Sequence, residues 1–410
     1  MDLKQVAGKL KPNEKLVLKE VDAFLAKLNS ELKKHKLNAE AAAGGSIAKG
    51  TFLKGDHDVD LFVKFSKEYL SEKLADHLEK ALSKFKFSRV HGSRDYFQIK
   101  SKNFVFEIIP VYNVSFAHEI VNITDASPLH VKWVKSQFEK KPELADQIRL
   151  VKAFCKAQGV YGAESYIKGF SGHVLDILVI YYGGFMELLK NAVKWSPKQV
   201  IDFYNTYKGK AVEMLNPSKT DSPLVLVDPV QSNRNAAASL SNEKFYTFIE
   251  KAEEFLKNPS AKFFEKKKFS LADIKKRAND NQLILLHAKA LEGKEDIVGS
   301  KLLKSYSYIR NQLVINNFKL HDSGWNWDKK NTAIFWYITD KKEIPKTYNW
   351  EGPPVNSNDF VKLFKDKHKI TFEKDGRVYA VVERKFTKAK DLIKSIITEE
   401  YIKEKVKSIK

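Results

Sequence analysis

The segment from residue 39 to residue 65 constrains the fold of this chain most strongly. Ala39–Ala43 predicts a short strand, and Gly44-Gly45-Ser46 predicts a tight turn that opens a helix. From Asp58 to Phe65, apolar and polar residues alternate, which predicts a second strand with Asp58 and Asp60 together on one face. With a helix before it and a helix and further strands after it, this segment predicts a compact α/β domain that extends to about residue 135.

The acidic residues of these strands indicate a metal site. Two carboxylates at positions i and i+2 of one strand lie close together and repel each other, and a divalent cation such as Mg²⁺ relieves that repulsion. A third carboxylate is needed if two ions are held, and Glu107 is the best candidate because it is a single acid in the apolar strand Phe104–Ile109. The glycine–serine turn offers backbone N–H groups and a hydroxyl to a phosphate.

The remaining periodicity divides the chain into three parts. Helical spacing predicts helices at about 14–34, 68–84, 143–158, 171–190, 197–207, 242–257, 298–317, 357–367 and 387–408. Strand-like runs lie at 95–100, 104–109, 224–229, 283–287, 333–338 and 378–384. We therefore expect an α+β multidomain fold, with an α/β head at 1–140, a mainly helical domain at 141–258 and α+β lobes at 259–410.

The charge of the chain indicates a polyanionic partner. Lys and Arg number 72 against 51 Asp and Glu, so the formal net charge is +21. Such an excess suits a nucleic-acid backbone, although an anionic membrane surface or a generally Lys-rich proteome would also explain it. One stretch combines this charge with phenylalanines; it contains Lys262, Phe263, Phe264, Lys266, Lys267, Lys268, Phe269, Lys275, Lys276 and Arg277.

Other features indicate a cytoplasmic protein. The single cysteine, Cys155, lies in an apolar helical pattern, which makes a core residue the better interpretation than a nucleophile. Residues 1–13 are polar and have no apolar segment of the kind found in secretion signals. The most apolar run, Val174–Phe185, includes Asp176 and is too short to span a bilayer.

The segment from Gly44 to Thr51, together with Asp58-Val59-Asp60, resembles the signature of the polymerase-beta-like nucleotidyltransferase superfamily. Within it the chain resembles the archaeal-type (class I) CCA-adding enzymes over nearly its whole length. The further segments that carry this resemblance are Thr124–His130, Val160–Glu164 with Gly169–Gly172, Val227–Val230 with Arg234-Asn235 and Ala237-Ala238, Gly352-Pro353-Pro354, and Arg384–Thr387.

The resemblance implies roles for particular residues. Asp58, Asp60 and Glu107 match the family's three metal-binding carboxylates, although the family usually has Glu at the first position and Asp at the third. Ser46 and Lys49 match contacts to the triphosphate, where the family often has Arg at the second position. The other matches are His130, Lys152 and Tyr161 for the triphosphate or sugar, and Arg234 for the base. Ser93-Arg94-Asp95-Tyr96 departs from the family, which often has His-Pro-Tyr there.

Without the resemblance, plainer interpretations of these residues stay open. Lys152 could be a solvated lysine, Tyr161 and Phe170 core aromatics, and His130 a hydrogen-bonded histidine. Arg234-Asn235 could cap the chain before the helix at 242–257. His57, between two aspartates, is better explained as a surface residue at a strand edge than as a metal ligand.

The activity that the resemblance implies is addition of C, C and A to the 3′ end of tRNA from CTP and ATP, with two Mg²⁺ ions as cofactors. The expected partner is the acceptor–TΨC arm of tRNA, with no membrane, and a homodimer is left open. Two alternatives stay open: a poly(A) polymerase or oligoadenylate-type enzyme, and an RNA-binding protein without catalysis.

Overall fold

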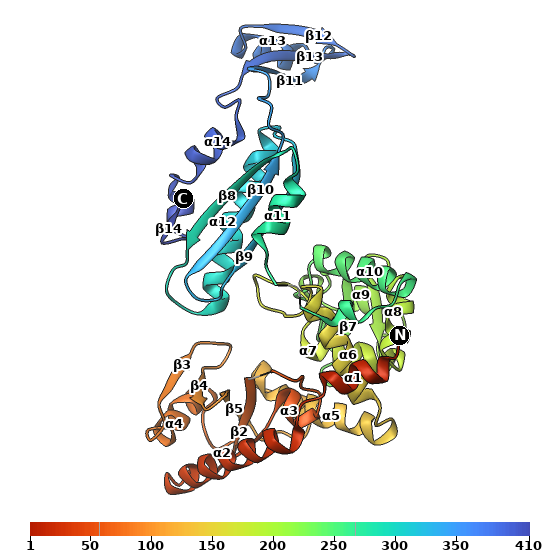
Figure 1. Cartoon of the computed structure of the whole chain (residues 1–410), viewed down its shortest axis with the longest axis vertical. Coiled ribbons are helices and arrows are strands. Elements are labelled where there is room, and N and C mark those ends of the chain that lie inside the picture. The colour runs from red at the N-terminus through yellow and green to blue at the C-terminus, as the bar shows by residue number, and fades with distance from the viewer. Residues whose placement is uncertain (57, 267) are drawn as a thin grey trace. The chain divides into compact units, whose positions relative to one another are not determined.

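The computed structural model describes residues 1–56, 58–266 and 268–410 and divides into two compact units, residues 1–267 and 268–410 (Figure 1). His57 and Lys267, which the sequence placed at a strand edge and in the basic stretch, lie outside the described residues. The first unit contains two large hydrophobic cores and the second contains one. The α+β multidomain fold is confirmed, and the boundaries near residues 140 and 258 stay predictions.

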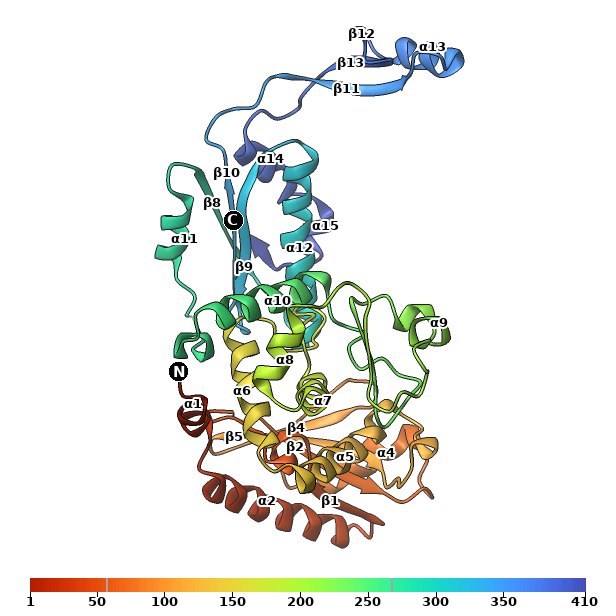
Figure 2. The same cartoon turned by 90° about the vertical axis from the view of Figure 1, so that its right-hand side faces the viewer.

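The first core lies between a mixed sheet and helix α2. The strands are β1 (Ala39–Ala43), β2 (Asp58–Phe65), β3 (Phe87–Val90), β4 (Tyr96–Ser101) and β5 (Phe104–Tyr112), in the order β1-β2-β5-β4-β3. The helices are α2 (Glu14–Lys34), α3 (Gly45–Lys49) and α4 (Leu74–Ala81). Only β2 and β5 pair in parallel among these described strands. Phe24 of α2 stacks on Phe106 of β5, so α2 covers the apolar face of the sheet (Figure 2).

The second core is mainly helical. Its helices are α1 (Leu3–Leu10), α5 (Ala126–Lys140), α6 (Leu144–Ala157), α7 (Gly172–Tyr182), α8 (Phe185–Ala192) and α10 (Asn242–Lys257). The short helix α9 (Ala211–Met214) packs in a small separate cluster. A parallel pair of short strands, β6 (Gln199–Asp202) and β7 (Leu224–Val227), lies beside them. Phe154 and Cys155 of α6 are fully buried in this core, which confirms the interpretation of the cysteine. Phe170 is also a fully buried core aromatic.

The second unit contains two sheets. Its strands are β8 (Gln282–Lys289), β9 (Leu320–Trp327), β10 (Thr332–Thr339), β11 (Thr347–Pro354), β12 (Thr371–Lys374), β13 (Arg377–Glu383) and β14 (Ser408–Ile409). Its helices are α11 (Leu271–Ala278), α12 (Glu295–Ile315), α13 (Asn358–Lys367), α14 (Ala389–Ile396) and α15 (Glu400–Lys403). The sheet orders are β14-β8-β10-β9 and β11-β13-β12. Helix α12 packs on one face of the first sheet, and α11 lies on the opposite side (Figure 2).

Some predicted helices are wrong or too long. The segment predicted as a helix at 197–207 contains strand β6 instead, because its β-branched Val200 and Ile201 pair with Val225 and Leu226 of β7. The helix predicted at 68–84 shortens to α4, preceded by the 3₁₀ turn Ser71–Lys73. The helix predicted at 387–408 separates into α14, α15 and β14.

The helix predicted at 171–190 is interrupted, and the interruption also affects whether this apolar segment could span a membrane. Gly183 (φ +82°) and Gly184 (φ +156°) adopt conformations that end α7 before α8 begins. Within the described residues, no single helix combines the length and apolar character that crossing a bilayer requires. Helices α7 and α8 meet that measure only as a pair bent by 93°.

Candidate active site

The three predicted acids come together on one face of the head sheet. Strands β2 and β5 are parallel neighbours, and their register places Asp60 directly opposite Glu107. Asp58 lies two residues before Asp60 on β2, so all three side chains leave the same face of the sheet. The residues that precede Asp60 and Glu107 on their strands, Val59 and Phe106, are buried in the core on the other face. Glu107 is half-buried, and its carboxylate accepts a hydrogen bond of 2.7 Å from Gln98 of β4.

The glycine–serine turn lies against this acidic face. The backbone N–H of Gly44 donates to the carbonyl of Asp60 at 2.8 Å, which fixes the start of α3 beside β2. Gly45 has a φ of +49°, and a Cβ at this position would lie 1.7 Å from Asp60 Oδ2. Only a glycine therefore allows the Asp60 carboxylate to lie so close to the backbone of the turn.

The environment of Asp60 disfavours its ionised form until a cation is present. Burial raises the pKa of Asp60, Lys49 opposes that effect, and the nearby charge of Asp58 raises the pKa further. A divalent cation bound to Asp58 and Asp60 would cancel both effects. The donor set therefore fits a hard cation such as Mg²⁺, which prefers carboxylate oxygens.

A buried group of cations lies beside the acids. Lys49 of α3 donates to Asp176 Oδ2 at 2.7 Å, and Lys152 of α6 lies 3.4 Å from Asp176 Oδ1. Lys152 also donates to the Thr51 hydroxyl at 2.9 Å. Lys152 is 4% exposed, so the interpretation as a solvated lysine is wrong. Burial lowers the pKa of Lys152, although Asp176 partly offsets that effect.

These groups line one cavity of about 330 Å³ within the first unit. Six of the predicted site residues are among its lining: Ser46, Lys49, Asp60, His130, Lys152 and Tyr161. In the part of the chain that the structure describes, Asp58, Glu107 and Arg234 do not line the cavity. Both acids nevertheless lie next to the cavity, because Asp58 and Glu107 are neighbours of Asp60 in the sheet and Asp60 lines it.

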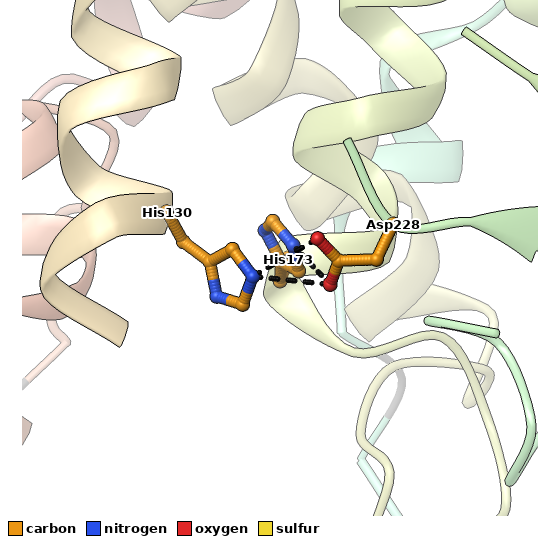
Figure 3. A group of neighbouring side chains, drawn as sticks. All are labelled: His130, His173 and Asp228. Atoms are coloured by element: carbon orange, nitrogen blue, oxygen red, sulfur yellow. Dashed lines mark hydrogen bonds and ion pairs between the residues drawn. The ribbon is translucent and has the colours of Figure 1, made fainter. Parts of the chain in front are cut away.

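Arg234 is connected to the cavity through a buried carboxylate. Asp228, directly after β7, is fully buried and accepts a hydrogen bond of 2.9 Å from Arg234 Nη1. His130 Nε2 lies 3.1 Å from Asp228 Oδ1, and His173 Nε2 lies 3.4 Å from Oδ2 (Figure 3). His130 is therefore a hydrogen-bonded histidine that also lines the cavity. Burial lowers the pKa of His173 to about 4, and charge on His130 contributes in the same direction.

Arg234-Asn235 does not cap the helix that follows, as one interpretation of the sequence suggested. Asn235 accepts hydrogen bonds from the backbone of Leu226 and Ala237, and α10 is capped by Ser241. The cap assigned to Arg234-Asn235 is therefore wrong. Arg94, where the chain departs from the resembled family, is buried and pairs with Asp125. It ties the β3–β4 connection to the start of α5.

Three residues of the site were not predicted: Asp176, His173 and Asp228. Asp176 carried a usable signal, because a charged residue inside the most apolar run needs a buried partner. Asp228 stood in a quoted family segment, but nothing in its spacing indicated its partners. His173 gave no signal, since its partners come from distant segments of the chain.

A parallel strand pair that carries three acids, a glycine–serine helix start and a cationic cavity define a nucleotidyltransferase. A nucleotidyltransferase domain model matches residues 25–119. The fold also resembles the solved structures of a cytoplasmic RNA terminal U-transferase and of the Cid1 terminal uridylyl transferase. Each has a TM-score of 0.52 over 65% of this chain and 98% of that chain, at 18% and 17% identity.

The family models for the tRNA nucleotidyltransferase second domain and the CCA-adding enzyme C-terminal domain match residues 146–265 and 284–408. The CCA-adding enzyme of Methanocaldococcus jannaschii is 31% identical, covering 96% of this chain and 90% of its own. That of Nanoarchaeum equitans is 35% identical over 84% of each chain. The chain belongs to the family of CCA-adding enzymes.

Proposed function

We propose that this enzyme adds C, C and A to the 3′ end of tRNA, using CTP and ATP and releasing pyrophosphate. The observation that carries the proposal is the pairing of Asp60 with Glu107 across β2 and β5, beside a cavity lined by Ser46, Lys49 and Lys152. The carboxylates that would bind metal therefore lie next to the cationic groups that would bind phosphate, as transfer of a nucleotidyl group requires. Membership of the family supplies the identity of the acceptor.

Asp58, Asp60 and Glu107 would hold two Mg²⁺ ions. Bound there, the ions would lower the pKa of the tRNA 3′-hydroxyl and neutralise charge that develops on the pyrophosphate. Gln98 orients the Glu107 carboxylate by donating a hydrogen bond to it. Glu107 is longer than the aspartate usual at this position, and the bond to Gln98 restrains its rotation.

The cavity residues would bind the nucleotide. Lys49 and Lys152 share the single carboxylate of Asp176, so one of their two charges is left to attract the triphosphate. Ser46 at the start of α3 offers a hydroxyl and its backbone N–H, and His130 and Tyr161 line the same cavity. These groups act by positioning and charge, so no covalent intermediate on the protein is required.

Arg234 is the residue that we assign to reading the base. Its side chain is 33% exposed, so its guanidinium keeps donors available to a ligand after pairing with Asp228. The enzyme uses no template, so the choice between bases rests on hydrogen bonds that a wrong base leaves unmade. Arg234 and the end of the tRNA together would supply those bonds.

The tRNA would bind through its acceptor–TΨC arm. The net charge of +21 suits its phosphates, and Lys275, Lys276 and Arg277 form the basic last turn of α11 in the second unit. A cytoplasmic location and a homodimer belong to this proposal, and sedimentation of the purified protein with and without tRNA tests the second.

The activity is tested with tRNA transcripts that end one, two or three nucleotides before the final A. We expect each to receive only the nucleotides that it lacks, AMP alone after CC and CMP before AMP in the two shorter transcripts, with no addition to a complete transcript. Unlimited AMP addition would favour a poly(A) polymerase or an oligoadenylate-type enzyme. tRNA binding without addition of any nucleotide would favour an RNA-binding protein without catalysis.

A further inference from the structure

Asp228 joins elements that are far apart in the sequence. Its carboxylate accepts hydrogen bonds from the backbone N–H groups of Val230 and Gln231, at 2.9 and 3.1 Å. It also contacts three side chains: His130 of α5, His173 of α7 and Arg234, which follows β7 (Figure 3). Asp228 is fully buried, so its contacts form in a region of low dielectric.

The same group of residues resembles a metal site, but the other donors argue against one. One ligand atom each from His130, His173 and Asp228 lies within 4.8 Å of the others. However, both carboxylate oxygens already accept hydrogen bonds, and the Arg234 guanidinium lies 2.9 Å from Oδ2. A cation placed there would meet a fixed positive charge that already uses this oxygen.

The geometry instead fixes His130. Its Nε2 faces Asp228, and the second ring nitrogen, Nδ1, points away from that carboxylate (Figure 3). Because a carboxylate only accepts, Nε2 is the donor in this pair, and the ring is held with Nδ1 directed away from Asp228. Of the charged groups near the ring, the Asp228 carboxylate contacts it directly, and Arg234 pairs with the same carboxylate.

His173 helps to hold this arrangement. Its ring stacks on that of His130 with centroids 3.9 Å apart. Because its pKa is about 4, His173 is neutral at neutral pH and places no positive charge against the ring of His130. One buried carboxylate thus orients both the histidine that lines the nucleotide cavity and the arginine assigned to the base.

We infer that Asp228 is a positioning residue that couples triphosphate binding by His130 to base selection by Arg234. The inference rests on the proposed function for the identity of the nucleotides. It goes beyond that function by assigning to one buried side chain the link between the two ends of the bound nucleotide. Asp228 itself contacts neither end.

The test uses the full chain with Asp228→Asn, which keeps the shape of the side chain and removes its charge. Asp221→Asn is the matched control, because Asp221 is an exposed acid seven positions earlier in the same region. The dissociation constants for CTP and ATP are measured by equilibrium dialysis without tRNA. We expect Asp228→Asn to weaken both by about tenfold or more, and the control to stay within about twofold of the parent.

A double-mutant cycle separates positioning from a general loss of structure. Asp228→Asn and His130→Ala should be non-additive for CTP affinity, because the first releases the ring that the second removes. Additive effects, or Asp228→Asn affinities within about twofold of the parent, would overturn the inference. If Asp228→Asn does not fold, the cycle is run with Arg234→Gln and His130→Asn. Non-additivity is again expected, and additivity again overturns the inference.

Base selection supplies a second readout. Asp228→Asn should lower the preference for CTP over UTP in the first addition to tRNA, by a factor similar to that of Arg234→Gln. An unchanged preference would contradict the link to Arg234. Failure of the unaltered protein to add C and A would instead overturn the proposed function, and the dialysis comparison without tRNA would still decide the role of Asp228.

Discussion

Lys49 Nζ lies 2.7 Å from Asp176 Oδ2, and neither of these side chains is more than 8% exposed. Lys152 reaches the other oxygen of the same carboxylate at 3.4 Å. Burial alone would raise the pKa of Asp176, but the two ammonium groups outweigh it and lower that pKa. A carboxylate from the most apolar helix thus holds two cations at the wall of the nucleotide cavity.

Removing the charge of Asp176 should destabilise the fold. Asp176→Asn leaves two buried ammonium groups without their counterion. We therefore expect the free energy of unfolding, measured by urea denaturation, to fall by about 3–5 kcal/mol. Glu187→Gln on α8 is the control, because that side chain is 53% exposed and should change stability by less than about 0.5 kcal/mol. Equal losses in the two variants would contradict the role of the buried network.

Gly45 should be irreplaceable for activity. In Gly45→Ala the new Cβ would lie 1.7 Å from Asp60 Oδ2, so the carboxylate must move. We expect the rate of CMP addition to fall by about 100-fold, the loss typical of a misplaced catalytic group. Gly50→Ala is matched to it, since Gly50 ends the same helix with a φ of +65°, and a Cβ added there would have no described atom within 4 Å. Similar rates for the two variants would show that the contact with Asp60 is unimportant.

The low pKa of His173 should make stability depend on pH. The unfolded chain binds a proton on this residue near pH 6.5, whereas the folded chain does so only near pH 4. Its contribution is therefore present above pH 6.5 and is lost as the pH falls from there to about 4. The loss should be about 2–3 kcal/mol, because the side chain is largely buried. Urea unfolding at pH 7 and pH 4.5 should show a smaller drop for His173→Gln, and an equal drop would count against this assignment.

Local patterns predicted the head sheet but not the partners of its buried charges. The alternation from Asp58 to Phe65 gave both the strand and the face of its acids, because a strand's period is independent of the rest of the fold. A single acid in an apolar strand pointed to Glu107, but the parallel pairing of β2 with β5 that places it opposite Asp60 depends on long-range topology. The segment at 197–207 was misassigned because its pairing with β7 overrides local helical spacing.

The same limit explains the contacts that the sequence did not predict. Lys152 has the helical spacing of a surface residue, and its burial depends on Thr51 and Asp176, which lie on other elements. Asp228 likewise contacts His130 and His173, which lie 98 and 55 positions earlier in the sequence. Neither set of contacts produces a periodic pattern that can be recognised in a single sequence.

Gln98 should strengthen metal binding although it is not itself a metal ligand. Its amide donates to Glu107 at 2.7 Å, and Gln98→Ala removes that restraint on the carboxylate. We expect Mn²⁺, used as a probe in paramagnetic resonance titrations, to bind about 10–100-fold more weakly. Gln5→Ala, at an exposed position of α1, should leave the affinity unchanged. Unaltered Mn²⁺ affinity in Gln98→Ala would argue against an ion at Glu107.

The three-acid site is tested most directly by the rate of CMP addition to a tRNA that lacks its terminal CCA, measured under single-turnover conditions for Asp60→Asn. The variant keeps the shape of the side chain but removes the charge that lies opposite Glu107. We predict a rate at least about 1,000-fold below that of the parent protein, with tRNA affinity within about twofold. A rate within about tenfold of the parent would contradict metal-dependent catalysis by Asp58, Asp60 and Glu107.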